Sequence, residues 1–166
     1  MRSERAFSLI ELLVVIALIG IFLTAITLSL GGDRRGDELA EESQRFQALL
    51  EMAHEQAMLR SEEWAVQIEP DRYQFLQLIN NEWLPVENDR LLRPRDFAKG
   101  TELDLELEGR EARLAVVEEG YKPTLLLLSS GEITPFNAVF LADDTERRFR
   151  VTGDLLGELS WEVVDS

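Results

Sequence analysis

The chain has 166 residues, of which 45% are apolar, 32 are acidic and 17 are basic, for a net charge of -15. Because affinity for nucleic acids comes mainly from Lys and Arg neutralising phosphates, this charge argues against a nucleic-acid partner. The absence of cysteine excludes a disulfide scaffold, thiolate metal sites and cysteine nucleophiles. The length suits one domain with an appended segment.

The N-terminal part is a long apolar segment. Residues 12–30 hold no charge, and residues 7–30 hold a single one, on Glu11. About 20 apolar residues are enough for a helix to cross the hydrocarbon core of a bilayer, so we expect a membrane span over residues 7–30. Arg2 and Arg5 precede this span, which predicts a cytoplasmic N-terminus and an exported C-terminal part.

A cleavable signal peptide is the alternative for this segment, with Ser29-Leu30-Gly31 as the cleavage site. The apolar run is longer than the roughly 7 to 15 residues usual in such peptides, and Glu11 lies near its cytoplasmic end. A carboxylate inside a bilayer helix is costly unless it finds a partner. We therefore prefer the membrane span, and Glu11 needs a specific role.

The residues around Glu11 resemble a known signal sequence. The stretch Ala6-Phe7-Ser8-Leu9-Ile10-Glu11-Leu12-Leu13-Val14-Val15 is similar to the class III signal sequence of type IV pilins and type II secretion pseudopilins. The resemblance implies that a prepilin peptidase removes the leader 1–6, cuts between Ala6 and Phe7, and methylates the amine of Phe7. It also implies that Glu11 pairs with the amine of Phe7 on a neighbouring subunit during filament assembly. The family usually has Gly where this chain has Ala6, which is also small.

Residues 31–60 are expected to form the exported half of the same helix. Gly31, Gly32 and Gly36 are weak helix formers that can loosen or bend it near its start. Beyond them, apolar residues recur at helical spacing and predict a core-facing stripe. The stripe consists of Leu39, Phe46, Leu49, Leu50, Ala53 and Ala57. If the two halves join, one helix covers residues 8–59; His54, the only histidine, is expected to be structural or at the surface.

Residues 61–166 are expected to form a β-rich domain, because apolar and polar residues alternate from Trp64 onward. We expect antiparallel strands at 64–68, 73–78, 83–86, 103–107, 113–117, 125–128, 136–141, 147–151 and 160–164. Asn80 and Asn81 predict a tight hairpin turn, since Asn tolerates the left-handed conformation. Residues 125–128 are four leucines, apolar on both faces, and predict a central strand.

Residues 87–100 are expected to form an irregular loop with a small local excess of positive charge. Arg90, Arg93, Arg95 and Lys99 outnumber the acidic residues there. Two interpretations stay open: a solvated loop, or a contact for an acidic partner subunit.

A second motif, Leu128-Ser129-Ser130-Gly131-Glu132-Ile133-Thr134-Pro135-Phe136, resembles a strand-turn-strand segment of the protein H family of minor pseudopilins. The resemblance implies an α+β, pilin-like fold, in which a long N-terminal helix with a transmembrane first half precedes a small antiparallel β-sheet or sandwich. It implies a structural subunit, not an enzyme, near the tip of the periplasmic pseudopilus of the type II secretion system, which supports export of folded proteins across the outer membrane. Implied partners are the other minor pseudopilins, the major pseudopilin, the prepilin peptidase and the inner-membrane secretion platform. No cofactor, metal or nucleic acid is expected.

Two other functions were weighed. A minor pilin of a type IV pilus is the nearest rival, but the acidic composition disfavours its DNA-binding branch. An anchored periplasmic hydrolase could use the acidic pairs 62–63, 118–119 or 143–144. Each pair falls at the end of an expected element, where solvated charge is normal, and no nucleophile with an orienting base is visible. Calcium binding at these pairs lacks a recognisable ligand loop.

Overall fold

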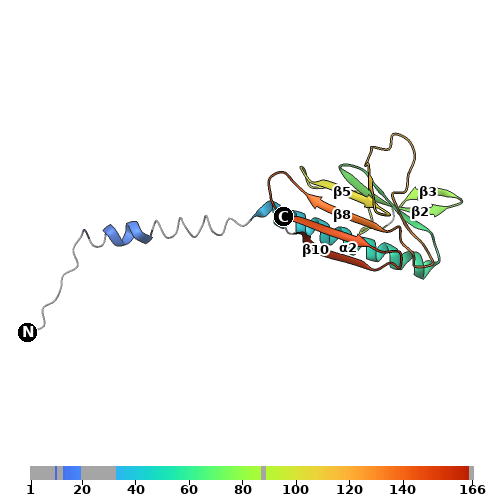
Figure 1. Ribbon diagram of the computed structural model, residues 1–166, viewed down its shortest axis with the longest axis horizontal. Coiled ribbons are helices and arrows are strands. Elements are labelled where there is room, and N and C mark those ends of the chain that lie inside the picture. Colours follow the sequence, from blue (N-terminus) through green and yellow to red (C-terminus); the bar gives the residue numbers. More distant parts are fainter. Residues whose placement is uncertain (1–9, 11–12, 20–32, 87–88, 165–166) are drawn as a thin grey trace, which may run out of the picture. The chain divides into compact units, whose positions relative to one another are not determined.

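The computed structural model describes residue 10 and residues 13–19, 33–86 and 89–164 (Figure 1). The chain divides into two compact units, Met1–Arg34 and Arg35–Ser166. In the first unit, residues 13–19 are helical. No helix within the described residues is long and apolar enough to cross a membrane, and most of the expected span over 7–30 lies outside those residues.

Helix α2 (Arg34–Arg60) is the helix of the second unit. It begins inside the predicted glycine-containing patch, and Gly36 is buried in its first turn. The predicted stripe is buried throughout, which confirms the helical period: it comprises Leu39, Phe46, Leu49, Leu50, Ala53 and Ala57. Residues 20–32, on which one continuous helix over 8–59 depends, lie outside the described residues.

The strands form two sheets in which every pair is antiparallel. The first sheet has the order β3 (Glu82–Pro85), β2 (Arg72–Ile79), β1 (Trp64–Ile68) and β7 (Leu125–Leu127), with the short β4 (Arg95–Asp96) also paired to β2. The second has the order β10 (Leu159–Val164), β9 (Arg148–Gly153), β8 (Phe136–Leu141), β5 (Glu102–Leu107) and β6 (Arg110–Ala112). The predicted antiparallel domain is confirmed.

The chain changes sheets three times: between β4 and β5, between β6 and β7, and between β7 and β8. The motif 128–136 makes the last change. Leu128 donates its backbone N–H to the Glu132 carbonyl at 2.9 Å, and Gly131 takes the positive φ of 93° that the turn needs. The strand-turn-strand segment is therefore a crossover that joins the two sheets.

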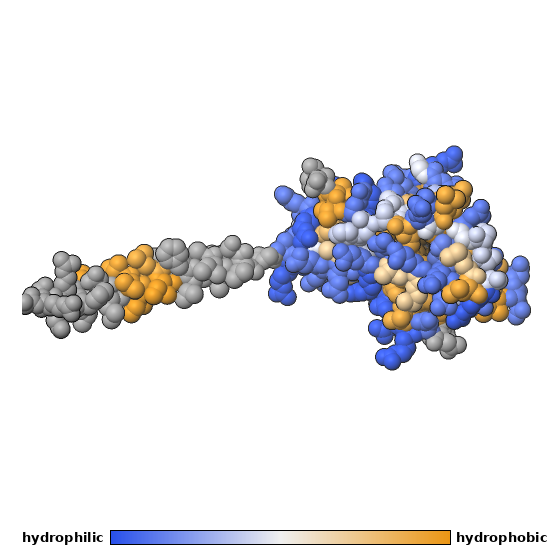
Figure 2. Space-filling model, turned by 90° about the horizontal axis from the view of Figure 1, so that it is seen from below, coloured by the Kyte–Doolittle hydropathy of each residue, from blue (hydrophilic) through white to orange (hydrophobic). Residues whose placement is uncertain are grey.

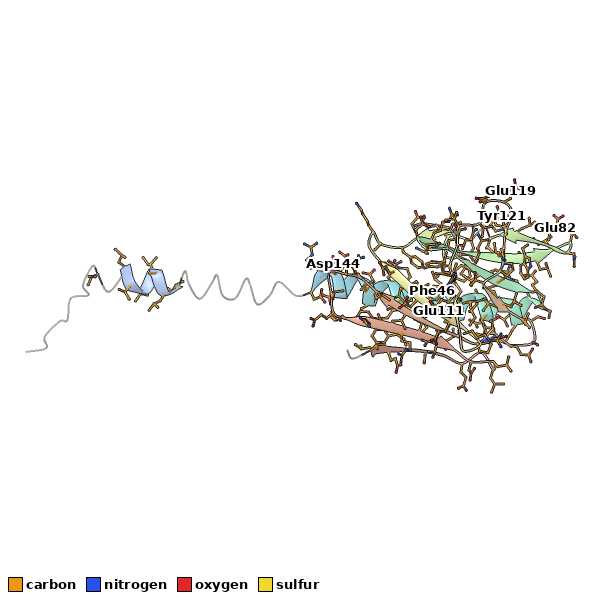
Figure 3. All side chains as sticks on the ribbon, turned by 45° about the horizontal axis from the view of Figure 1, so that its top comes forward. Phe46, Glu82, Glu111, Glu119, Tyr121 and Asp144 are labelled. Atoms are coloured by element: carbon orange, nitrogen blue, oxygen red, sulfur yellow. The ribbon has the colours of Figure 1, made fainter. Side chains whose placement is uncertain are left out.

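Helix α2 and both sheets share one core. The Phe46 ring is fully buried and packs edge-on against Tyr73 of β2 and Phe140 of β8, with ring centroids 5.1 and 5.6 Å apart. Phe97 also contacts both Tyr73 and Phe140. Figure 1 shows α2 running along the strands, and Figure 3 shows Phe46 in the middle of the domain. A single helix residue thus touches both sheets, and the α+β, pilin-like fold is confirmed.

Three details differ from the sequence-based expectations. The strand expected at 113–117 is β6 at Arg110–Ala112, because Glu108 and Gly109 turn the chain with φ of 50° and 75° and pairing resumes at once. The leucines 125–128 are not central: β7 is an edge strand, with Leu126 37% exposed. The loop 87–100 contains β4, which was not predicted.

The hairpin prediction is confirmed. Asn80 and Asn81 connect β2 to β3 with φ of 52° and 67°. Both values lie in the left-handed region, which suits the twist of a two-residue hairpin.

Candidate functional site

The residues predicted to direct processing and assembly, Ala6, Phe7 and Glu11, lie outside the described residues. The described neighbours of Glu11 are apolar and exposed. Their exposed fractions run from 42% to 71% and belong to Ile10, Leu13, Val14, Val15, Ile16, Leu18 and Ile19. A run of exposed apolar side chains on a helix needs lipid or another protein to cover it.

The first turn of α2 is fastened to loops of the domain. Arg35 donates from Nη2 to the Lys99 carbonyl at 2.8 Å and to Thr101 Oγ1 at 3.2 Å. Its Nε lies 3.3 Å from Asp144 Oδ1, and its side chain is only 12% exposed. Figure 3 shows Asp144 beside this end of α2. The arginine therefore holds the start of the helix against two separate loops.

Three carboxylates of the acidic pairs 62–63, 118–119 and 143–144 have structural contacts, namely Glu62, Glu63 and Asp144. Glu63 accepts hydrogen bonds from the backbone N–H and the hydroxyl of Ser129, at 3.2 and 2.6 Å. Glu62 accepts one from Trp64 Nε1 at 3.2 Å. Within the described part of the chain, no group of three or more His, Cys, Asp or Glu side chains is placed to hold a metal ion. These carboxylates stabilise turns and element ends.

His54 has a structural contact. It is buried, and its Nε2 lies 2.9 Å from the Gly131 carbonyl oxygen in the turn after β7. Gly157, in the turn before β10, lies against the same ring: a Cβ there would come within 2.4 Å of His54 Cε1. The imidazole therefore sits between α2 and two turns.

Tyr73 of β2 is a buried phenol with a shifted pKa. Burial raises the pKa of Tyr73 to about 12, the nearby charge of Arg95 opposes the rise, and Glu42 adds to it. Its hydroxyl has no hydrogen-bond partner among the described residues. Glu42 is itself buried and accepts a hydrogen bond from the Ala98 N–H at 2.9 Å.

The surface of the described residues carries several open hollows. One hollow of about 380 Å³ lies under the long connection between β6 and β7, beside Ile68 and Leu107. Another, of about 710 Å³, is lined by Arg90, Arg93 and Arg95. Figure 2 shows separate apolar patches set in a hydrophilic surface, and Figure 3 shows Glu119 and Tyr121 together at one side of the domain. Such a surface suits contacts with other proteins.

The sequence predicted the buried stripe of α2 and the basic loop 87–100. It did not predict the side-chain contacts between residues that lie far apart in the chain. Glu63 reaches Ser129 across 66 positions, and Trp161 Nε1 donates to Ser43 Oγ across 118 positions at 2.8 Å. No local pattern indicates such pairs.

An apolar N-terminal segment followed by a helix packed across two antiparallel sheets defines a pilin-like subunit. Residues 1–27 match the prokaryotic N-terminal methylation motif, and residues 42–157 match the family of Type II transport protein GspH. The chain belongs to this GspH family, and its role is that of a minor pseudopilin in type II secretion.

Relatives and solved structures agree with the assignment. The chain is 36% identical to type II secretion system protein H of Pseudomonas aeruginosa over 146 residues, which cover 82% of each chain. It is 31% identical to the protein of that name from Aeromonas hydrophila over 173 residues, covering 96% of this chain and 94% of the relative. The minor pseudopilin EpsH of Vibrio cholerae aligns with a TM-score of 0.64 and 30% identity, over 76% of this chain and 96% of that one. Escherichia coli GspH, at 17% identity and a TM-score of 0.62, shares the fold over 80% of this chain and 93% of its own.

Proposed function

We propose that the chain is a non-enzymatic subunit near the tip of a short periplasmic pseudopilus, which supports export of folded proteins across the outer membrane. Residues 7–30 anchor it in the inner membrane, with the short N-terminus in the cytoplasm and residues 31–166 in the periplasm. The observation that supports this most is the pairing, in one chain, of a methylation motif over 1–27 with a GspH domain over 42–157.

In this proposal the prepilin peptidase cuts between Ala6 and Phe7 and methylates Phe7. The carboxylate of Glu11 then pairs with that amine on a neighbouring subunit, because two opposite charges attract strongly in a poorly hydrated surrounding. The exposed apolar side chains at residues 10 and 13–19 support a segment that lipid covers first and neighbouring subunits cover later.

The proposed partners are the major pseudopilin, the other minor pseudopilins and the inner-membrane secretion platform. No cofactor or metal is required for this role. The structural contacts of Glu62, Glu63 and Asp144 support a role in shape and contact instead of catalysis.

The test is co-purification of the full chain from its own host with the other filament subunits. Glu11→Leu should stay in the membrane fraction but lose co-purification with the filament, because the pairing carboxylate is gone. Glu119→Leu, which makes the same change on an exposed loop, should co-purify normally. Normal co-purification of Glu11→Leu would contradict the pairing. The mass of the mature N-terminus should correspond to N-methylated Phe7, and a chain that begins near Gly32 would contradict the pilin pathway.

A further inference from the structure

We propose that the surface around Arg90, Arg93 and Arg95 is a docking groove for an acidic segment of a neighbouring filament subunit. The proposal rests on the function proposed above and names the chemistry of one contact within it.

The groove has a charge opposite to that of the chain. Residues 89–99 contain four basic and two acidic side chains, so 4 - 2 gives a local charge of +2 in a chain of net charge -15. The ion pairs of the described residues use other arginines, namely Arg35, Arg45, Arg147 and Arg150. Among these residues, Arg90 and Arg93 have no carboxylate partner and are exposed. Their guanidinium groups are available for a carboxylate from outside, which they can bind through two parallel hydrogen bonds.

The three arginines converge on one hollow. Arg90, Arg93 and Arg95 line a volume of about 710 Å³ together with Asp89 and Leu91. Leu91 is 52% exposed, so the hollow also offers an apolar contact. A concave site with several arginines and one aliphatic side chain fits a segment that carries carboxylates and an apolar residue.

A second hollow shares one lining residue, Asp89, with the first. This hollow has a volume of about 410 Å³, and Trp64, Ile79, Pro85 and Val86 contribute to its wall. Arg60, the last residue of α2, adds a further basic side chain there. Both hollows thus offer basic side chains to a carboxylate-bearing segment, and the exposed Leu91 and Ile79 offer it apolar contacts.

The backbone of the loop is held in place before any partner binds. Asp89 Oδ1 accepts hydrogen bonds from the N–H groups of Leu91 and Leu92, at 2.7 and 3.2 Å. Leu92 is fully buried, and Arg95 pairs with Tyr73 in the short β4. Arg95 Nη2 also donates to the Leu91 carbonyl at 3.0 Å. A preformed site loses less conformational entropy on binding, which favours a specific contact over a solvated loop.

The negative net charge of the chain favours a protein partner over a nucleic acid. A nucleic acid presents phosphates along its length, so most of it would face the acidic surface around the groove and be repelled. A short acidic segment of a folded protein can place its carboxylates in the groove alone. The exposed Leu91 beside the arginines also favours a partner that brings an apolar side chain.

The test is photocrosslinking of the full chain in its own host, with p-benzoylphenylalanine at position Leu91. We expect an adduct with another filament subunit, mapped by peptide mass to a segment rich in carboxylates. Arg90→Glu combined with Arg93→Glu should lower the adduct yield about tenfold or more. The control pair, Arg110→Glu combined with Arg113→Glu, makes the same charge change on exposed residues outside the groove and should leave the yield unchanged.

An adduct with a segment that lacks carboxylates, with a second copy of this chain, or with nucleic acid or lipid would overturn the proposal. A yield that charge reversal does not lower would do so too. A second probe at Leu156, which is 78% exposed in the turn before β10, distinguishes failure of the groove from failure of the proposed function. Adducts with filament subunits from Leu156 but none from Leu91 overturn the groove alone. No adduct with a filament subunit from either position contradicts the proposed function as well.

Discussion

Replacing Phe46 by alanine tests whether one helix side chain holds both sheets. The ring is fully buried and forms edge-on pairs with Tyr73 and Phe140. Truncating a buried Phe to Ala costs about 3–5 kcal/mol, and each edge-on aromatic pair is worth about 0.5–1.5 kcal/mol beyond its buried area. Because two such pairs are lost, we expect the upper part of that range, about 4–5 kcal/mol. Domains of this size have only about 5–15 kcal/mol of stability, so the loss is a large fraction of the total.

The assay is unfolding of the full chain in mild detergent, followed by tryptophan fluorescence, to which the buried Trp64 contributes together with Trp83 and Trp161. The midpoint temperature should fall by roughly 12–20 °C for such a loss. Leu59→Ala is the matched control, because Leu59 lies on the same helix but is 74% exposed, and it should change stability by less than about 0.5 kcal/mol. A loss below about 2 kcal/mol for Phe46→Ala, or one no larger than that of the control, would refute a core shared through this ring.

Three further changes probe the turns and the buried phenol. Gly157→Ala should cost about 1–3 kcal/mol more than Gly120→Ala in the same unfolding assay: both glycines have positive φ, but only at Gly157 does a Cβ meet His54 and the Gly131 carbonyl, at 2.4 and 2.8 Å. Equal losses of stability in the two variants would show that the structure accommodates the added Cβ at Gly157 without cost. Glu63→Gln should cost about 1.5 kcal/mol, because Ser129 loses a charged acceptor, whereas Glu55→Gln on the exposed face of α2 should be neutral. In a Tyr121→Phe variant Tyr73 is the only tyrosine left, and its ultraviolet titration should give a pKa of about 12 instead of 10.0. Since the fold favours the neutral phenol, this contribution to stability is complete below pH 10.0 and is lost as the pH rises to about 12; ionisation in the folded protein near pH 10.0 would contradict the burial of this group.

Local patterns were enough to predict the helix and most strands. The apolar stripe of α2 repeats with the helical period, and Asn80-Asn81 marks its hairpin, because both depend on near neighbours in the chain. The prediction that residues 125–128 form a central strand was wrong, because it also used only near neighbours in the chain. Four leucines indicate burial on both faces, yet β7 has a strand partner on one side only, and sheet order depends on contacts distant in sequence.

The same limit applies to the candidate sites: local patterns predict the residue types, but contacts distant in sequence determine how those residues are arranged. The arginines of residues 90–95 are visible as a local charge pattern, whereas the hollow that they line depends on the buried Leu92 and on the pairing of β4 with β2. The strand expected at 113–117 shows a further limit: the tight turn at Glu108 and Gly109 brings pairing forward to Arg110. Turn geometry shifted this strand by three residues without changing the fold.

The fastening of the first turn of α2 has a mechanical consequence. Arg35 reaches Lys99, Thr101 and Asp144, and Arg147 pairs with Asp37 at 2.6 Å, so the start of the helix is bound to loops that enter both β5 and β9. A pull on the beginning of α2 therefore loads these bonds side by side instead of peeling the helix away one contact at a time. Resistance to a pull depends on the rate of unfolding, and contacts that must break together slow it most. Separating the start of α2 from the domain therefore requires the loss of several contacts to two loops.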